Sequence, residues 1–187
     1  MTHLRGIVLF VALFMPATHA IAAEAAPAPP PPATAAEFSA EECVVWAREL
    51  SFARAVAEHD AAAFASHLQA DTAFNSGKPQ PLRGREVVTS AWGDIIAGKE
   101  LKLLWYPTRA TIGGPGDVAW SSGPALFEWP GRDPAQRFAI GTYHSVWHKD
   151  ADGVWRILFD EGAGMKPADE TAVKAFHAGR SEACPPA

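Results

Sequence analysis

Hydrophobic residues recur at helical spacing in the first part of the chain. Ser39 and Glu42 have the spacing of a capping box, and Phe38 before them can act as a hydrophobic staple, so a helix should begin here. Asp60 can cap a second, shorter helix over 61–68, and a third helix is expected over 85–97. The first helix turns one apolar stripe toward the core, formed by Cys43, Trp46, Leu50, Ala53 and Ala57.

After Gly98 the pattern changes to that of extended chain. Runs rich in β-branched and aromatic residues alternate with segments of turn-forming residues, and the runs span 101–112, 118–129, 136–148 and 154–160. Their short connections predict an antiparallel meander. A further short strand at 72–75 precedes the third helix, so the order is α-α-β-α-β-β-β-β. This order predicts an α+β fold, in which N-terminal helices cover a curled antiparallel sheet and leave a cone-shaped pocket.

The first 22 residues have the features of a cleavable signal peptide. Arg5 precedes an apolar run at 6–14, and Ala20 and Ala22 are small residues at the positions that a signal peptidase reads. The run is far shorter than the roughly 20 residues of a membrane span. We therefore expect cleavage near Ala22 and a periplasmic or secreted protein without a stable membrane anchor.

The remaining chain divides into a linker, a domain and a tail. Residues 23–37 are rich in Pro and Ala and should form no core. The folded domain is expected at 38–165, followed at 166–187 by a C-terminal helix and tail. Cys43 and Cys184, the only cysteines, lie near the two ends of the folded part. In an oxidising compartment we predict that they pair and tie the tail to the domain, with two free buried thiols as the alternative.

Composition narrows the range of functions. A hydrophobic fraction of 48% with 20% charged residues is typical of a globular domain. The net charge of -5 argues against binding to nucleic acid, which requires a basic face. The chain carries no recognisable metal-ligand, dinucleotide or serine-nucleophile motif, so we expect no metal, no cofactor and no serine-hydrolase chemistry.

Three segments resemble the nuclear transport factor 2-like superfamily, in its SnoaL-like branch, also described as domain of unknown function 4440. Residues 141–147 (GTYHSVW), with 152–157 (DGVWRI) and Asp160, resemble the closing hairpin of that branch. Residues 116–123 (GDVAWSSG) resemble its preceding strand, and 49–60 its first helix. The resemblance covers nearly everything from residue 43 to about 162. It implies a cone-shaped α+β domain, commonly dimeric, and leaves the function open among isomerases, cyclases, dehydratases and non-catalytic binding modules.

Two carboxylates and one hydroxyl are the candidate catalytic groups. Glu49 falls on the apolar side of the first helix, either as a pocket acid or base with a raised pKa or as a fixed acceptor for a buried indole or phenol. Asp160 ends the last strand, where it could face the pocket or cap the sheet edge. In ketosteroid isomerase-like members, the catalytic carboxylates lie at places that hold Asn75-Ser76-Gly77 and Tyr143 here. A steroid-isomerase mechanism is therefore not expected, although Tyr143 could donate a hydrogen bond to a ligand oxygen.

Aromatic residues are the remaining signal, because this small domain contains seven tryptophans. We expect aromatic side chains from several helices and strands to line the pocket. For each of these side chains, the alternative is packing in the core or in a dimer interface on the convex face of the sheet. The leading hypothesis is an exported domain that holds a small apolar or aromatic molecule and pairs as a homodimer through the sheet. The alternatives are a cofactor-independent isomerase, cyclase or dehydratase that uses Glu49 or Asp160 as base and Tyr143 as donor, and a non-catalytic dimeric interaction module. The expected pocket residues are Trp46, Phe74, Trp92, Trp105, Trp120, Tyr143 and Trp147.

Overall fold

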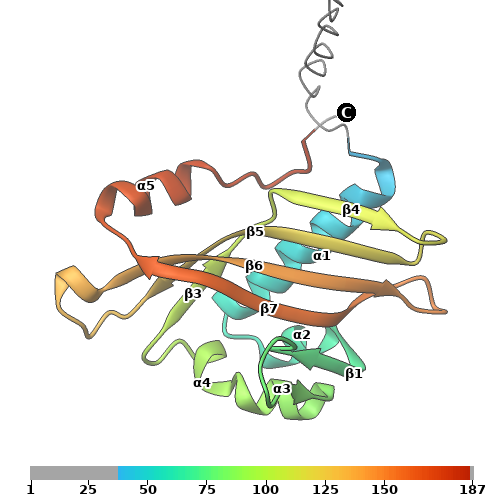
Figure 1. Ribbon diagram of the computed structural model, residues 1–187, viewed down its shortest axis with the longest axis horizontal. Helices are drawn as coiled ribbons and strands as arrows, with labels where there is room; N and C mark the ends of the chain where they lie inside the picture. The colour runs from blue at the N-terminus through green and yellow to red at the C-terminus, as the bar shows by residue number, and fades with distance from the viewer. Residues whose placement is uncertain (1–37, 186–187) are drawn as a thin grey trace, which may run out of the picture. The chain divides into compact units, whose positions relative to one another are not determined.

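A seven-stranded mixed sheet forms the body of the protein, with the strand order β2-β1-β7-β6-β5-β3 and with β4 paired to β5 (Figure 1). The computed structural model describes residues 38–185, so the expected signal peptide and linker lie outside the described residues. The strands are β1 (Leu68–Phe74), β2 (Leu82–Arg83), β3 (Lys102–Trp105), β4 (Arg109–Gly113), β5 (Val118–Glu128), β6 (Phe138–Lys149) and β7 (Trp155–Pro167).

Helices precede the sheet, lie between its strands and follow it in the chain. They are α1 (Ala40–Ala57), α2 (Ala61–Ser66), α3 (Arg85–Ala91), α4 (Gly93–Ile96), the short 3-10 helix η1 (Pro134–Gln136) and α5 (Glu170–Ala178). The caps form as the sequence predicts: the Ser39 hydroxyl accepts from the Glu42 N–H at 3.2 Å, and Asp60 accepts from the Ala63 N–H at 2.8 Å. The predicted α+β plan, with N-terminal helices against a curled sheet, is confirmed. Within residues 38–185, no helix combines the length and the apolar character that a membrane crossing requires.

Three details differ from the expected elements. The strand expected over 101–112 is divided into β3 and β4, because Pro107 lacks the N–H that a strand ladder needs. At this break the chain passes so close to β5 that a Cβ on Gly123 would lie 2.0 Å from the Tyr106 carbonyl oxygen. The helix expected over 85–97 is interrupted at Trp92, giving α3 and α4. The sheet is mixed rather than wholly antiparallel, because β1 pairs with β7 in parallel.

The main core lies between α1 and the concave side of the sheet. It is built from fully buried side chains of α1, α2 and the strands, among them Val45, Phe52, Phe64, Trp147 and Ile157. A smaller cluster joins α5 to the other face of α1 and to β5, through Trp46, Leu50, Tyr106, Leu126 and Phe176. The two packing regions hold the helices in fixed positions relative to the strands.

The C-terminal segment is attached to the domain by two bonds. The Tyr106 hydroxyl donates to the Phe176 carbonyl oxygen of α5 at 2.8 Å. Cys43 and Cys184 form a disulfide, with their Cα atoms 5.4 Å apart, so the predicted pairing is confirmed and the alternative of free thiols is not.

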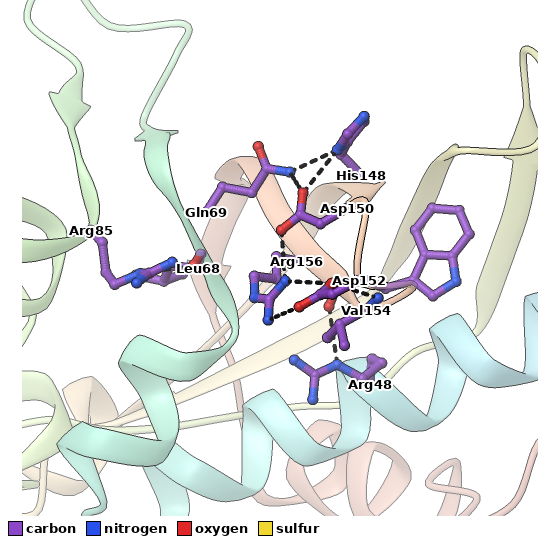
Figure 2. A network of polar contacts seen from close by, with 10 residues as sticks. Arg48, Leu68, Gln69, Arg85, His148, Asp150, Asp152, Val154 and Arg156 are labelled. Atoms are coloured by element: carbon purple, nitrogen blue, oxygen red, sulfur yellow. Dashed lines mark hydrogen bonds and ion pairs between the residues drawn. The ribbon is translucent and has the colours of Figure 1, made fainter.

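A polar network fastens the hairpin between β6 and β7 to β1 (Figure 2). Arg156 donates to Asp150 at 2.7 Å and to Asp152 at 2.9 Å. Gln69 on β1 donates to the same Asp150 at 2.5 Å, and His148 lies within 3.1 Å of it. The network therefore links β1, through Gln69, to the turn after β6 and, through Asp150, to Arg156 on β7.

Candidate functional site

A cavity of about 220 Å³ lies between the helices and the concave side of the sheet. Most of its wall is apolar and comes from α1, the α3–α4 junction, α4, β3 and β5, including Phe52, Trp92, Ile95, Leu103, Trp105 and Phe127. Its polar groups come from the other side, where Asn75 follows β1, Tyr143 lies on β6 and Asp160 on β7. The cavity is therefore amphipathic, with aromatic rings opposite a few oxygen and nitrogen atoms.

Asp160 is the carboxylic acid of this cavity. It is 8% exposed, and its Oδ2 accepts a hydrogen bond from the Ser145 hydroxyl at 2.7 Å. Burial raises the pKa of Asp160 to about 7, the negative charges of Glu49 and Glu161 act in the same direction, and the Ser145 bond opposes them. A carboxyl group with a pKa near neutrality can accept or release a proton at physiological pH.

Tyr143 stands beside Asp160, and its ring lines the same cavity. Its hydroxyl is buried and makes no hydrogen bond of good geometry within the described residues, although the Ser121 hydroxyl lies near enough to lower its pKa. Burial, together with the negative charges of Glu49 and Asp160, raises the pKa of Tyr143 well above its ordinary value. The phenol therefore keeps its proton at physiological pH and can act as a hydrogen-bond donor.

Glu49 is fully buried and does not line the cavity. Its Oε1 accepts from the Trp105 indole at 2.7 Å, and its Oε2 accepts from Ser121 at 2.6 Å and from the Trp147 indole at 3.2 Å. Burial raises the pKa of Glu49, while the bonds from Ser121 and Trp105 oppose that rise. The geometry is that of the fixed acceptor rather than of a pocket acid or base.

The aromatic residues expected in the pocket divide into two groups. Trp92, Trp105 and Tyr143 line the cavity. Phe74 does not, because it packs edge-on behind Trp92 at 5.4 Å, and Trp147 is fully buried beneath the floor of the cavity, edge-on to Phe52.

Two further tryptophans lie on other faces of the molecule. Trp46 belongs to the cluster under α5, on a side of α1 turned away from the cavity. Trp120 lies on the outer face of the sheet, 38% exposed and stacked on His144, because its neighbours Ala119 and Ser121 point inward. The sequence alone could not tell which face of β5 is concave.

Several lining residues were not singled out from the sequence. Ile95 and Phe127 were visible only as members of apolar runs, which do not distinguish a cavity wall from core. Asn75 was considered only as part of the segment Asn75-Ser76-Gly77, which supplies no carboxylate, and its φ of 58° is a left-handed conformation that Asn tolerates. In residues 38–185, no group of three or more His, Cys, Asp or Glu side chains is arranged to hold a metal ion.

The amino-acid sequence matches the profile of one protein family. The family profile of the SnoaL-like domain matches residues 47–162, which is more than half of the chain. The chain belongs to the SnoaL-like domain family. The predicted resemblance is thereby confirmed, and the matched segment contains both the cavity wall and Asp160. A comparison with curated proteins finds no match.

Solved structures share the fold at low sequence identity. A ketosteroid isomerase-like protein from Erwinia carotovora atroseptica is 14% identical, with a TM-score of 0.55, over 67% of this chain and 96% of its own. An NTF2-like protein of unknown function from Pseudomonas putida is 14% identical, with a TM-score of 0.56, over 73% and 94%. A domain of unknown function with a cystatin-like fold from Nostoc punctiforme is 16% identical, with a TM-score of 0.55, over 78% and 90%. At these identities the similarity establishes the fold alone.

Proposed function

We propose that this SnoaL-like domain binds a small aromatic molecule of one or two rings that carries one polar oxygen. The observation that supports it is the division of the cavity into an aromatic wall and a polar side. An apolar cavity of about 150 Å³ can hold benzene. A cavity of about 220 Å³ therefore suits a slightly larger ring system.

The polar groups define where the ligand's oxygen would lie. Tyr143 supplies an O–H, and Asp160 is an acceptor when ionised and also a donor when protonated. Trp92 and Trp105 offer ring surface on which an aromatic ligand can stack or lie edge-on. A ligand with a single hydroxyl or carbonyl group at one end uses both sides of the cavity.

Calorimetric titration with 2-naphthol tests this proposal, and naphthalene measures the contribution of the oxygen. We expect 2-naphthol to bind more tightly. Ala125→Leu places extra carbon atoms in the cavity wall and should weaken binding roughly tenfold or more, because a packed site accommodates added volume poorly. Ala47→Leu makes the same substitution on an exposed position of α1 and should leave binding unchanged. Absence of binding by the wild type, or equal binding by Ala125→Leu, contradicts the proposal.

A second candidate function is cofactor-independent acid–base catalysis, and the pKa of Asp160 near 7 favours it. In this function Asp160 removes a proton from carbon beside a carbonyl group, while Tyr143 donates a hydrogen bond to the carbonyl oxygen. The two-ring ketone 2-tetralone in D₂O is a suitable probe, with hydrogen–deuterium exchange followed by NMR. We expect the wild type to accelerate exchange and Asp160→Asn to lose the acceleration. Equal rates for the two proteins rule out this role.

We further propose that the chain is exported and that cleavage occurs near Ala22. The disulfide between Cys43 and Cys184 supports export, because such bonds persist mainly in oxidising compartments. Mass spectrometry of the mature protein from its native host measures the N-terminus directly. A mass that retains residues 1–22 contradicts cleavage.

A further inference from the structure

Trp105 is a residue of the cavity wall whose one polar atom, the indole nitrogen, already makes a hydrogen bond within the protein. Its ring lines the cavity, and it meets Phe52 edge-on with ring centroids 5.2 Å apart. Its indole N–H donates to Glu49 at 2.7 Å, inside the core and away from the cavity lining. The ring therefore offers hydrocarbon surface to a ligand and no free donor.

Glu49 holds three groups at once. Besides Trp105 on β3, it accepts from Ser121 on β5 at 2.6 Å and from Trp147 on β6 at 3.2 Å. Trp147 also donates to the Ser121 oxygen at 2.9 Å, so the two donors around Oε2 fix each other. Because Glu49 has no exposed surface, no water can take the place of these partners. One carboxylate thus determines the orientation of both indoles.

We propose that Glu49 is a positioning residue that determines which kind of ligand the cavity binds. By accepting from the Trp105 N–H, it turns the apolar surface of the indole toward the ligand. Polar groups of the ligand can then be recognised only on the side of Asp160 and Asn75. The inference rests on the proposed binding function. It explains why a carboxylate is kept in the core although it does not touch the cavity. Two neutral indoles need an acceptor there, and a carboxylate supplies several lone pairs at one point.

Glu49→Gln is the informative substitution because it keeps the shape of the side chain. The amide has one oxygen in place of two. Two donors, Ser121 and Trp147, meet at Oε2 against one at Oε1, so the amide oxygen should take the Oε2 position and turn its NH₂ group toward the Trp105 N–H. We expect the affinity for 2-naphthol to fall roughly tenfold, because a Trp105 indole whose N–H has lost its acceptor no longer holds its ring in place at the cavity wall. We also expect the Trp105 indole resonance in ¹H–¹⁵N NMR spectra to move.

A double-mutant cycle with Trp105→Phe separates positioning from general loss of stability. Trp105→Phe keeps a ring in the wall and removes the N–H, so Glu49→Gln should change the affinity by less than about twofold in this background. Thr72→Val alters another fully buried polar side chain outside the cavity and should leave both the affinity and the Trp105 resonance unchanged. A tenfold effect of Glu49→Gln that persists in the Trp105→Phe protein overturns the proposal.

The experiment still tests the proposal if the wild type does not bind the probe or if the variant does not fold. If the wild type binds no 2-naphthol, the binding function fails, while a Trp105 resonance that moves in Glu49→Gln still supports positioning and an unmoved one refutes it. If Glu49→Gln does not fold, the wild-type spectrum decides. A Trp105 indole proton that is shifted downfield and protected from exchange is the expected result, and a rapidly exchanging proton at the free-indole position overturns the proposal.

Discussion

Burial in the cavity wall raises the pKa of the Asp160 carboxyl group to about 7. Its Ser145 partner supplies one hydrogen bond, and burial outweighs it. In the unfolded chain the same carboxyl group ionises near its ordinary value of 3.8. Between these two values the folded state binds more protons than the unfolded state, so this group's contribution to stability decreases as the pH rises.

Asp160→Asn should remove that dependence. Between about pH 4 and about pH 7, the wild type should lose stability relative to the variant, by up to about 1.4 kcal/mol per pH unit. The difference between the two proteins is the informative quantity, because buried His67, whose pKa burial lowers to about 4, changes stability in the opposite direction in both. Urea unfolding at several pH values measures it. Parallel stability curves for the two proteins contradict the raised pKa.

Residue by residue, the sequence placed the polar groups better than the aromatic ones. Glu49 was recognisable because a carboxylate among apolar neighbours requires a partner, and Asp160 because it ends the last strand of the hairpin that carries the family resemblance. Trp46 and Trp120 could not be assigned, since an aromatic side chain suits the core, a cavity wall or an outer face equally well. Only the direction in which β5 curls distinguishes Trp120 from Ser121 beside it.

Among the elements, the caps, the turns and the antiparallel pairing of the C-terminal strands were predictable, and the pairing of β1 was not. Ser39 and Asp60 signal their helices through local hydrogen bonds, which neighbouring residues specify completely. The parallel pairing of β1 with β7 joins segments that are far apart in the sequence, and no local pattern encodes it. The continuation of β7 to Pro167 was missed for a different reason, because Gly162 and Gly164 interrupt the β-branched and aromatic pattern of the strand.

The disulfide should contribute to stability at this scale. Cys43 and Cys184 are separated by 141 positions, so their bond restricts a long loop of the unfolded chain. Replacing both with Ser should lower the free energy of unfolding by about 2 to 5 kcal/mol. Urea unfolding measures the loss, and wild-type protein in reductant should match the double variant. Equal midpoints for oxidised wild type and variant contradict this expectation.

For the whole molecule, we propose a homodimer that forms through the outer face of the sheet. Trp120 and Phe159 lie on that face on either side of Val146, as cross-strand neighbours, and are 38% and 41% exposed. Exposed apolar side chains gathered on one face are typical of interaction sites.

Trp120→Glu should convert the dimer to a monomer, because it places a charge in the centre of that face. Sedimentation equilibrium gives the mass. Val87→Glu is the matched control, since Val87 is 53% exposed on α3 and lies away from the outer face of the sheet. A monomeric wild type, or a dimeric Trp120→Glu protein, rules out this interface.

The bond between Cys43 and Cys184 also brings the first helix and the final residues of the domain to one point, as the adjoining ends in Figure 1 make visible. A short glycine-serine bridge between these ends would close the polypeptide into a ring without stretching it. New termini could then be opened in the exposed connection at 131–133 between β5 and β6, at the opposite end of the sheet from the start of α1 (Figure 1).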